Sequence, residues 1–133
     1  MDSEAVSSLA RAGDRSVASE RARAILAAAA EKHASVHIPA AVLSETFRGG
    51  PRDAAIDRVI RRAEGVVPLD LPVARIAGGL LARDGLDSCH AVDASVVASA
   101  IRLGGAVVYT GDPDDMRSLA RDHPNVLVRS LSG

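Results

Sequence analysis

Asp93 is the residue of this sequence that most requires a charged partner. Residues 91–103 have the composition and periodicity of a helix, in which Ser95 and Ser99 fall on one polar face while Asp93 lies nearly opposite, beside Val97. A carboxylate turned inward needs a cation, helix amides or a metal ion beside it. We therefore expect Asp93 to meet such a partner in the folded chain.

A second carboxylate follows an apolar run. Asp112 lies two residues beyond the strand-like stretch 106–109, and Thr110 in the same turn could hydrogen-bond a carboxylate or a bound water. In open parallel sheets, functional groups gather at the carboxyl ends of the strands. This position is therefore suited to a site residue.

Two further acidic residues could complete a cluster. Glu45 lies at the margin of the apolar face of the helical stretch 39–48, and Asp2 stands at the start of the chain. Several carboxylates in one place repel each other unless a divalent cation neutralises them, and oxygen ligands favour Mg²⁺ or Mn²⁺. Such ions activate water and neutralise charge on a phosphate oxygen, so cleavage of a phosphodiester is the leading hypothesis.

Helical and strand-like patterns alternate along the chain and predict an α/β fold with a parallel sheet covered on both faces. With 133 residues, the sequence predicts one domain, residues 1–133. The expected helices are residues 3–12, 17–32, 39–48, 52–64, 72–83, 91–103 and 113–121, and the expected strands are residues 35–38, 66–69, 106–109 and 125–128.

The composition argues against several classes of protein. Sixteen basic and 17 acidic residues give a net charge of −1, so no overall basic field attracts nucleic acid, and with 2% aromatic residues base stacking is excluded as the main recognition device. A lone Cys89, expected to be a buried thiol, allows no internal disulfide. No apolar run is long enough for a membrane span, and we expect a soluble, cytoplasmic protein.

Four segments together, residues 2–3, 38–45, 92–94 and 109–115, resemble the PIN-domain ribonucleases, especially the VapC-like toxins of toxin–antitoxin pairs. The resemblance implies a three-layer α/β/α sandwich with a central, mostly parallel sheet. It also implies a Mg²⁺- or Mn²⁺-dependent endoribonuclease that cleaves RNA, a VapB-like antitoxin partner and a homodimer. By this match the catalytic and metal-binding residues are Asp2, Glu45, Asp93 and Asp112, supported by Thr110 and Asp115.

The start of the chain departs from this family pattern. In the family an apolar strand, central in the sheet, runs into the first aspartate, whereas only Met1 precedes Asp2 here. We therefore expect a truncated first strand, which would unpair its neighbours and leave Asp2 on a frayed terminus.

Ordinary structural roles remain open for each candidate. Asp93 and Asp112 could cap the helices that they begin, and Glu45 could be an exposed helix carboxylate. Arg48 and Arg52 could contact an RNA backbone, or belong to a solvated face or an antitoxin docking site. The alternative function is a catalytically inactive PIN-like module that binds a protein.

Overall fold

The computed structural model describes residues 17–51 and 53–131, with side chains from residue 23 onward. Asp2, the predicted helix 3–12 and Arg52 therefore lie outside the described residues. The helices are α2 (Val17–Glu31), α3 (Ala40–Thr46), α4 (Asp53–Arg62), α5 (Leu71–Asp84), α6 (Ala91–Arg102) and α7 (Pro113–Ala120), with a 3-10 turn η1 (Ser88–His90); the strands are β1 (His37–Pro39), β2 (Gly65–Val67), β3 (Ala106–Thr110) and β4 (Val126–Ser130).

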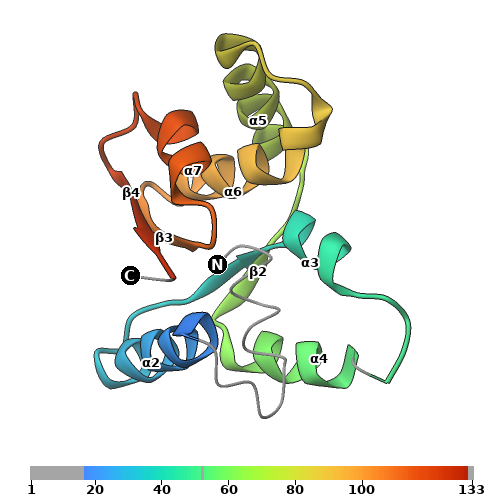
Figure 1. The fold of residues 1–133 in the computed structure, drawn as a ribbon, viewed down its shortest axis with the longest axis vertical. Coiled ribbons are helices and arrows are strands. Elements are labelled where there is room, and N and C mark those ends of the chain that lie inside the picture. The colour runs from blue at the N-terminus through green and yellow to red at the C-terminus, as the bar shows by residue number, and fades with distance from the viewer. Residues whose placement is uncertain (1–16, 52, 132–133) are drawn as a thin grey trace.

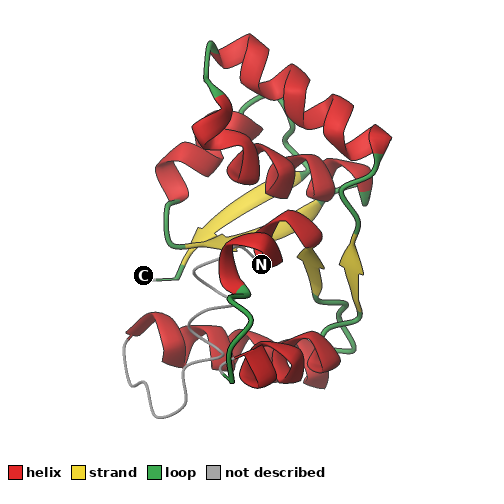
Figure 2. Ribbon diagram, turned by 90° about the vertical axis from the view of Figure 1, so that its right-hand side faces the viewer, coloured by secondary structure: helices red, strands yellow, loops and turns green. Residues whose placement is uncertain are grey.

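The strands lie between two groups of helices. Helices α5, α6 and α7 form the upper group in Figure 1, and α2 and α4 form the lower one. In the view turned by 90° the strands again separate these two groups (Figure 2). The predicted α/β class and the layered α/β/α arrangement are thus confirmed.

The sheet consists of two parallel pairs. Strand β1 pairs with β2, with Ile38 opposite Val66, and β3 pairs with β4, with Val108 opposite Val128. Parallel pairing is as predicted, but in the part of the chain that the structure describes no ladder joins β1 to β3. The sheet is therefore divided between β1 and β3.

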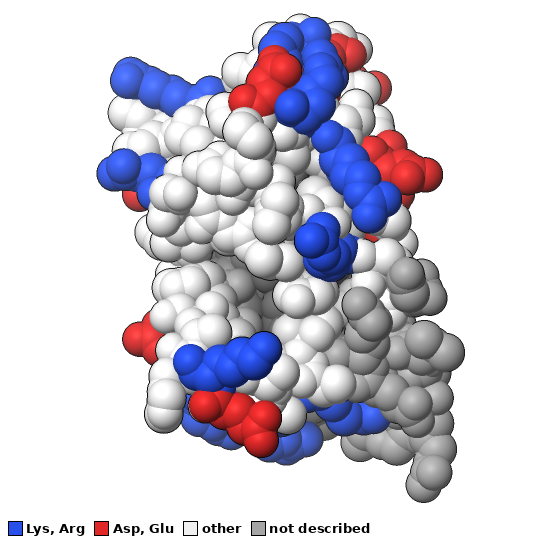
Figure 3. All heavy atoms as spheres, turned by 90° about the vertical axis from the view of Figure 1, so that its left-hand side faces the viewer, with Lys and Arg blue, Asp and Glu red and all other residues white. Residues whose placement is uncertain are grey.

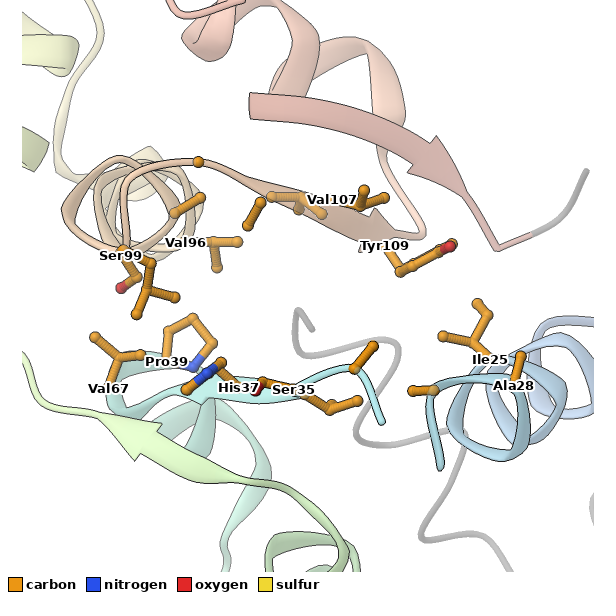
Figure 4. A pocket seen from close by; sticks show the side chains of 18 of the residues that line it. Ile25, Ala28, Ser35, His37, Pro39, Val67, Val96, Ser99, Val107 and Tyr109 are labelled. Carbon is orange, nitrogen blue, oxygen red and sulfur yellow. The ribbon is translucent and has the colours of Figure 1, made fainter. Parts of the chain in front are cut away.

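The two pairs also differ in direction. In the close-up of Figure 4, Ser35, His37 and Pro39 run across the view in the opposite sense to Val107 and Tyr109. In the described part of the chain, the two strand pairs therefore do not continue one another as a single sheet.

Helix α6 lies at the centre of the core, where it packs against α3, α5, α7, β1, β3 and β4. Val97 is fully buried, and the hydroxyls of Ser95 and Ser99 are also buried. The expectation that these serines form an exposed polar face was therefore wrong. Each hydroxyl donates to the carbonyl one turn earlier, at 2.8 Å to Ala91 and 2.7 Å to Ser95, so burial leaves neither donor unpaired.

Local sequence signals fix the ends of α5. Asp70 precedes the helix and its side chain accepts a hydrogen bond from the Val73 amide at 3.1 Å. Gly85 ends the helix in the left-handed conformation, at φ +64°, which a residue without Cβ adopts without strain. No helix among the described residues is both long and apolar enough to cross a bilayer.

Candidate metal centre

His90, Asp93 and Asp115 form a cluster at the amino-terminal ends of two helices. One ligand atom from each residue, an imidazole nitrogen or a carboxylate oxygen, lies within 4.8 Å of the other two. His90 and Asp93 are half-buried, whereas Asp115 is exposed. The site is therefore reached from solvent on the Asp115 side.

The local sequence places these three side chains. His90 is the residue before α6 and Asp93 lies three positions later, in the first turn, so both project from the same side of the helix. Asp115 lies in the first turn of α7, which packs beside α6 (Figure 1). The amino-terminal ends of both helices favour negative charge, which lowers the cost of bringing two carboxylates together.

The donor set fits a divalent cation. Two carboxylates and one imidazole nitrogen suit Mn²⁺ better than Mg²⁺, because Mg²⁺ strongly prefers oxygen ligands. The three ligand atoms lie close enough to one another to share one ion. The remaining ligands would come from water or substrate, since three protein ligands leave positions open.

Thr110 and Asp112 form the turn between β3 and α7. The Thr110 hydroxyl is fully buried and accepts a hydrogen bond from the Asp112 amide at 2.9 Å. Asp112 occupies the position before α7, yet its side chain makes no capping hydrogen bond to that helix. Thr110 therefore shapes the turn, and the ordinary capping role considered for Asp112 is absent.

Glu45 and Asp112 lie apart from the His90–Asp93–Asp115 cluster by the same distance criterion. Among the described residues, the groups of three or more possible ligands within 4.8 Å include neither of them. Glu45 follows β1 and Asp112 follows β3, and no ladder joins these two strands in the part of the chain that the structure describes. Of the sequence-based candidates, Asp93 and Asp115 are brought together.

Arg48 is exposed at the end of α3. Its guanidinium donates to the Phe47 carbonyl at 2.7 Å, and its amide donates to Asp53 at 3.1 Å. On the face shown in Figure 3, basic side chains are dispersed and several lie beside acidic ones. The contacts of Arg48 thus organise the link between α3 and α4, and the pictured face carries no continuous basic band.

His90 was not among the ligands predicted from the sequence, and the prediction that Cys89 is buried was wrong. The Cys89 thiol is exposed, not buried, because it lies in the short turn η1 that precedes α6. The spacing of His90 and Asp93, three residues apart at a helix start, was the available signal for His90. A residue that begins a helix is easily assigned to capping alone.

A separate, mostly apolar pocket of about 660 Å³ lies between the two strand pairs. Side chains from α2, β1, α6 and β3 line it, among them Ile25, Pro39, Val96 and Val107 (Figure 4). His90, Asp93 and Asp115 are not part of its lining. The pocket and the metal-ligand cluster are thus distinct features of the fold.

Comparison with known proteins gives one assignment. A family model described as the PIN domain matches residues 1–122, which is most of the chain. No curated protein sequence matches.

Proposed function

Since the chain belongs to the PIN domain family, whose fold is a nuclease fold, we propose that it is a metal-dependent endoribonuclease and the toxin of a toxin–antitoxin pair. The observation that carries the nuclease proposal is the cluster of His90, Asp93 and Asp115, whose ligand atoms lie within 4.8 Å of one another. Acidic groups placed this closely at helix ends are suited to hold a cation near a phosphate.

In the proposed mechanism each residue of the cluster has a separate task. Asp93 and Asp115 supply negative oxygen ligands, and His90 supplies a neutral nitrogen ligand. When bound, Mn²⁺ or Mg²⁺ would lower the pKa of a water molecule and neutralise charge developing on the phosphate. Asp112 directly precedes α7, and in this mechanism its carboxylate would orient the RNA backbone or water, while Thr110 holds the turn.

The residues outside the cluster have proposed roles through the family pattern. Asp2 and Glu45 remain proposed members of the acidic set, and Arg48 and Arg52 remain proposed contacts to the RNA backbone. The partners that we propose are RNA, a VapB-like antitoxin and a second copy of the chain in a homodimer, in the cytoplasm. These proposals rest on the resemblance of the sequence.

The substrate class is tested with matched nucleic acids. A fluorescently labelled RNA and a DNA of the same sequence are incubated with the protein in Mn²⁺ or in EDTA. We expect cleavage of the RNA in Mn²⁺ only. Equal cleavage of DNA would contradict the assignment to ribonucleases, and cleavage in EDTA would contradict metal dependence.

The toxin role is tested by induced expression in a bacterial host. We expect growth to stop on expression of the chain and to continue on expression of Asp93→Asn at the same protein level. Normal growth with the unaltered chain, when it cleaves RNA in vitro, would contradict the toxin role and leave the nuclease assignment standing.

One observation favours the alternative function, a catalytically inactive PIN-like module that binds a protein. Among the described residues, neither Glu45 nor Asp112 belongs to a group of three possible ligands within 4.8 Å, so the acidic candidates are divided. An acidic set divided in this way would supply fewer ligands to one metal ion. The alternative predicts no RNA cleavage in any metal, which the matched-substrate assay detects.

A further inference from the structure

A second group of possible ligands adjoins the proposed catalytic cluster and has a different chemistry. Asp87, Cys89 and His90 each place one ligand atom within 4.8 Å of the other two. Asp87 and Cys89 are exposed, and His90 is half-buried. The group therefore combines a carboxylate oxygen, a thiol sulfur and an imidazole nitrogen in one short turn.

A hydrogen bond to the backbone fixes this turn and leaves further positions on the Asp87 carboxylate for a metal ion. One oxygen of Asp87 accepts a hydrogen bond from the Cys89 amide at 3.0 Å, which begins η1. A carboxylate has room for several further interactions, because its two oxygens together carry about four acceptor positions. The capping hydrogen bond thus fixes the Asp87 carboxylate beside the thiol and leaves it able to bind a cation.

The mixture of donors determines which cation fits. Thiolate and imidazole ligands are typical of Zn²⁺, which binds Cys, His and Asp side chains in tetrahedral sites. Mg²⁺ selects oxygen ligands and does not favour sulfur. The Asp87–Cys89–His90 group therefore differs in metal preference from the pair of carboxylates at Asp93 and Asp115.

We propose that Asp87, Cys89 and His90 bind Zn²⁺, or a similar borderline-soft divalent cation, as a site distinct from the oxygen-rich position beside it. The three side chains supply three ligands, and water completes the coordination. Binding converts the Cys89 thiol to a thiolate and releases its proton to solvent, so affinity rises with pH.

His90 belongs to both groups, and this gives the site a regulatory consequence. Zn²⁺ held by the Asp87–Cys89–His90 group occupies the imidazole and removes it from Asp93 and Asp115. Zn²⁺ therefore weakens Mn²⁺ binding at the neighbouring position. This consequence rests on the proposed function of that position, whereas the Zn²⁺ site itself does not.

The site is tested by titrating the intact protein with Co²⁺, which replaces Zn²⁺ and absorbs in the near ultraviolet when bound to thiolate. Cys89 is the single cysteine of the chain, so such absorption reports this site alone. We expect one thiolate-bound Co²⁺ per chain, displaced by Zn²⁺. Absence of this absorption, or one metal ion shared between two chains, would overturn the proposal.

Two variants separate this site from its neighbour. Cys89→Ser is expected to lose the absorption and to bind Zn²⁺ roughly tenfold more weakly or worse in calorimetry. Asp93→Asn is the matched control, since it leaves Asp87, Cys89 and His90 in place and is expected to keep the absorption. Unchanged Zn²⁺ affinity in Cys89→Ser would overturn the proposal.

The regulatory consequence has its own readout, Mn²⁺ binding followed by electron paramagnetic resonance. Zn²⁺ is expected to weaken Mn²⁺ binding in the unaltered protein and to have little effect in Cys89→Ser. If the protein binds no Mn²⁺ but shows the thiolate absorption, the proposed function fails and the Zn²⁺ site stands. If Mn²⁺ binds normally and the absorption is absent, the Zn²⁺ site fails and the proposed function stands.

Discussion

Asp93 and Asp115 lie on different helices, and their carboxylate oxygens come within 4.8 Å of each other. Asp93 is in the first turn of α6 and Asp115 is in the first turn of α7, so two helix amino termini face the same small region. The positive ends of the helix dipoles offset part of the repulsion between these charges. A divalent cation bound between the two carboxylates would remove most of the remaining repulsion.

Substitution of Asp115 should weaken metal binding more than substitution of Asp112. Asp115→Asn removes a ligand from the cluster, whereas Asp112 does not belong to it by the 4.8 Å criterion. We expect Mn²⁺ affinity to fall by about tenfold or more in Asp115→Asn, measured by electron paramagnetic resonance. A larger loss in Asp112→Asn would assign the metal position to the turn after β3 instead.

Without metal, Asp115→Asn should not reduce stability. The change removes one of two neighbouring negative charges, so the free energy of unfolding in EDTA should stay the same or rise. Thermal unfolding in EDTA and in Mn²⁺ measures this directly. Destabilisation of the variant in EDTA would indicate that Asp115 has a structural role.

Arg121→Ala should destabilise the fold by about 1–2 kcal/mol. Arg121 forms an ion pair with Asp84, whose side chain is only 5% exposed, and the next cation, at Arg83, lies 3.7 Å away. Without Arg121 the buried Asp84 carboxylate would lose one of its two ion-pair partners. Chemical denaturation measures the change in the free energy of unfolding.

Arg117→Ala is the matched control for this ion pair. Arg117 lies in α7, the helix that Arg121 follows, and contacts Asp114 at 3.8 Å, but the Asp114 side chain is 96% exposed. Exposed ion pairs contribute little to stability, so the free energy of unfolding should fall by less than about 0.5 kcal/mol. Equal effects of the two substitutions would show that burial of Asp84 does not matter.

Gly105→Ala should destabilise the β3–β4 pair. Gly105 has φ +120°, and an added Cβ would lie 2.8 Å from the Asn125 carbonyl oxygen, beside the hydrogen bond that this oxygen accepts from Ala106. We expect the free energy of unfolding to fall by about 2–3 kcal/mol, from backbone strain at residue 105 and displacement of Asn125 together. Gly104→Ala, with φ +86° and open space around the added atom, should cost only about 1 kcal/mol.

These two glycine variants are compared by chemical denaturation under the same conditions. A similar loss in both would mean that the backbone conformation alone accounts for the effect. A greater loss in Gly105→Ala would assign the difference to the contact with Asn125.

Asp87 should control the reactivity of Cys89. A hydrogen bond between the Asp87 carboxylate and the Cys89 thiol raises the pKa of the thiol, and the same hydrogen bond lowers the pKa of Asp87. The thiolate, which is the reactive form, is thus formed at higher pH than for an ordinary cysteine. Asp87→Asn should shift the pH profile of alkylation by iodoacetamide to lower pH, measured in EDTA. An unchanged profile would contradict this account.

The alternation of strands and helices could be predicted from the sequence because each element has a local signal. The ends of the elements were less well predicted: Pro39, expected to begin a helix, still pairs with Val67 as the last residue of β1. The expected strand 66–69 ends at Val67, before Pro68, because a residue without an amide hydrogen cannot donate to a ladder. The division of the sheet into two pairs depends on which strands meet in three dimensions. Local patterns carry little information about that arrangement.

The candidate site could be predicted only in part, for a similar reason. Asp93 was a candidate because the helical period turns its carboxylate inward, and Asp115 was a candidate through the family resemblance. The helical pattern placed Ser95 and Ser99 toward solvent, because the rule treats hydroxyls as polar and does not anticipate their hydrogen bonds to the preceding turn. For His90 the spacing from Asp93 was the one local signal, whereas Cys89 lies in a short turn, where neither periodicity nor composition indicates which side chains converge.

The central claim is tested most directly by Mn²⁺-dependent cleavage of a mixed RNA pool by three proteins: the unaltered chain, Asp93→Asn and Asp114→Asn. Asp114 is exposed in the same turn as Asp115 and belongs to neither ligand group, so its substitution is the matched control. We expect cleavage by the unaltered chain and by Asp114→Asn, and none by Asp93→Asn. Undiminished cleavage by Asp93→Asn would contradict the account.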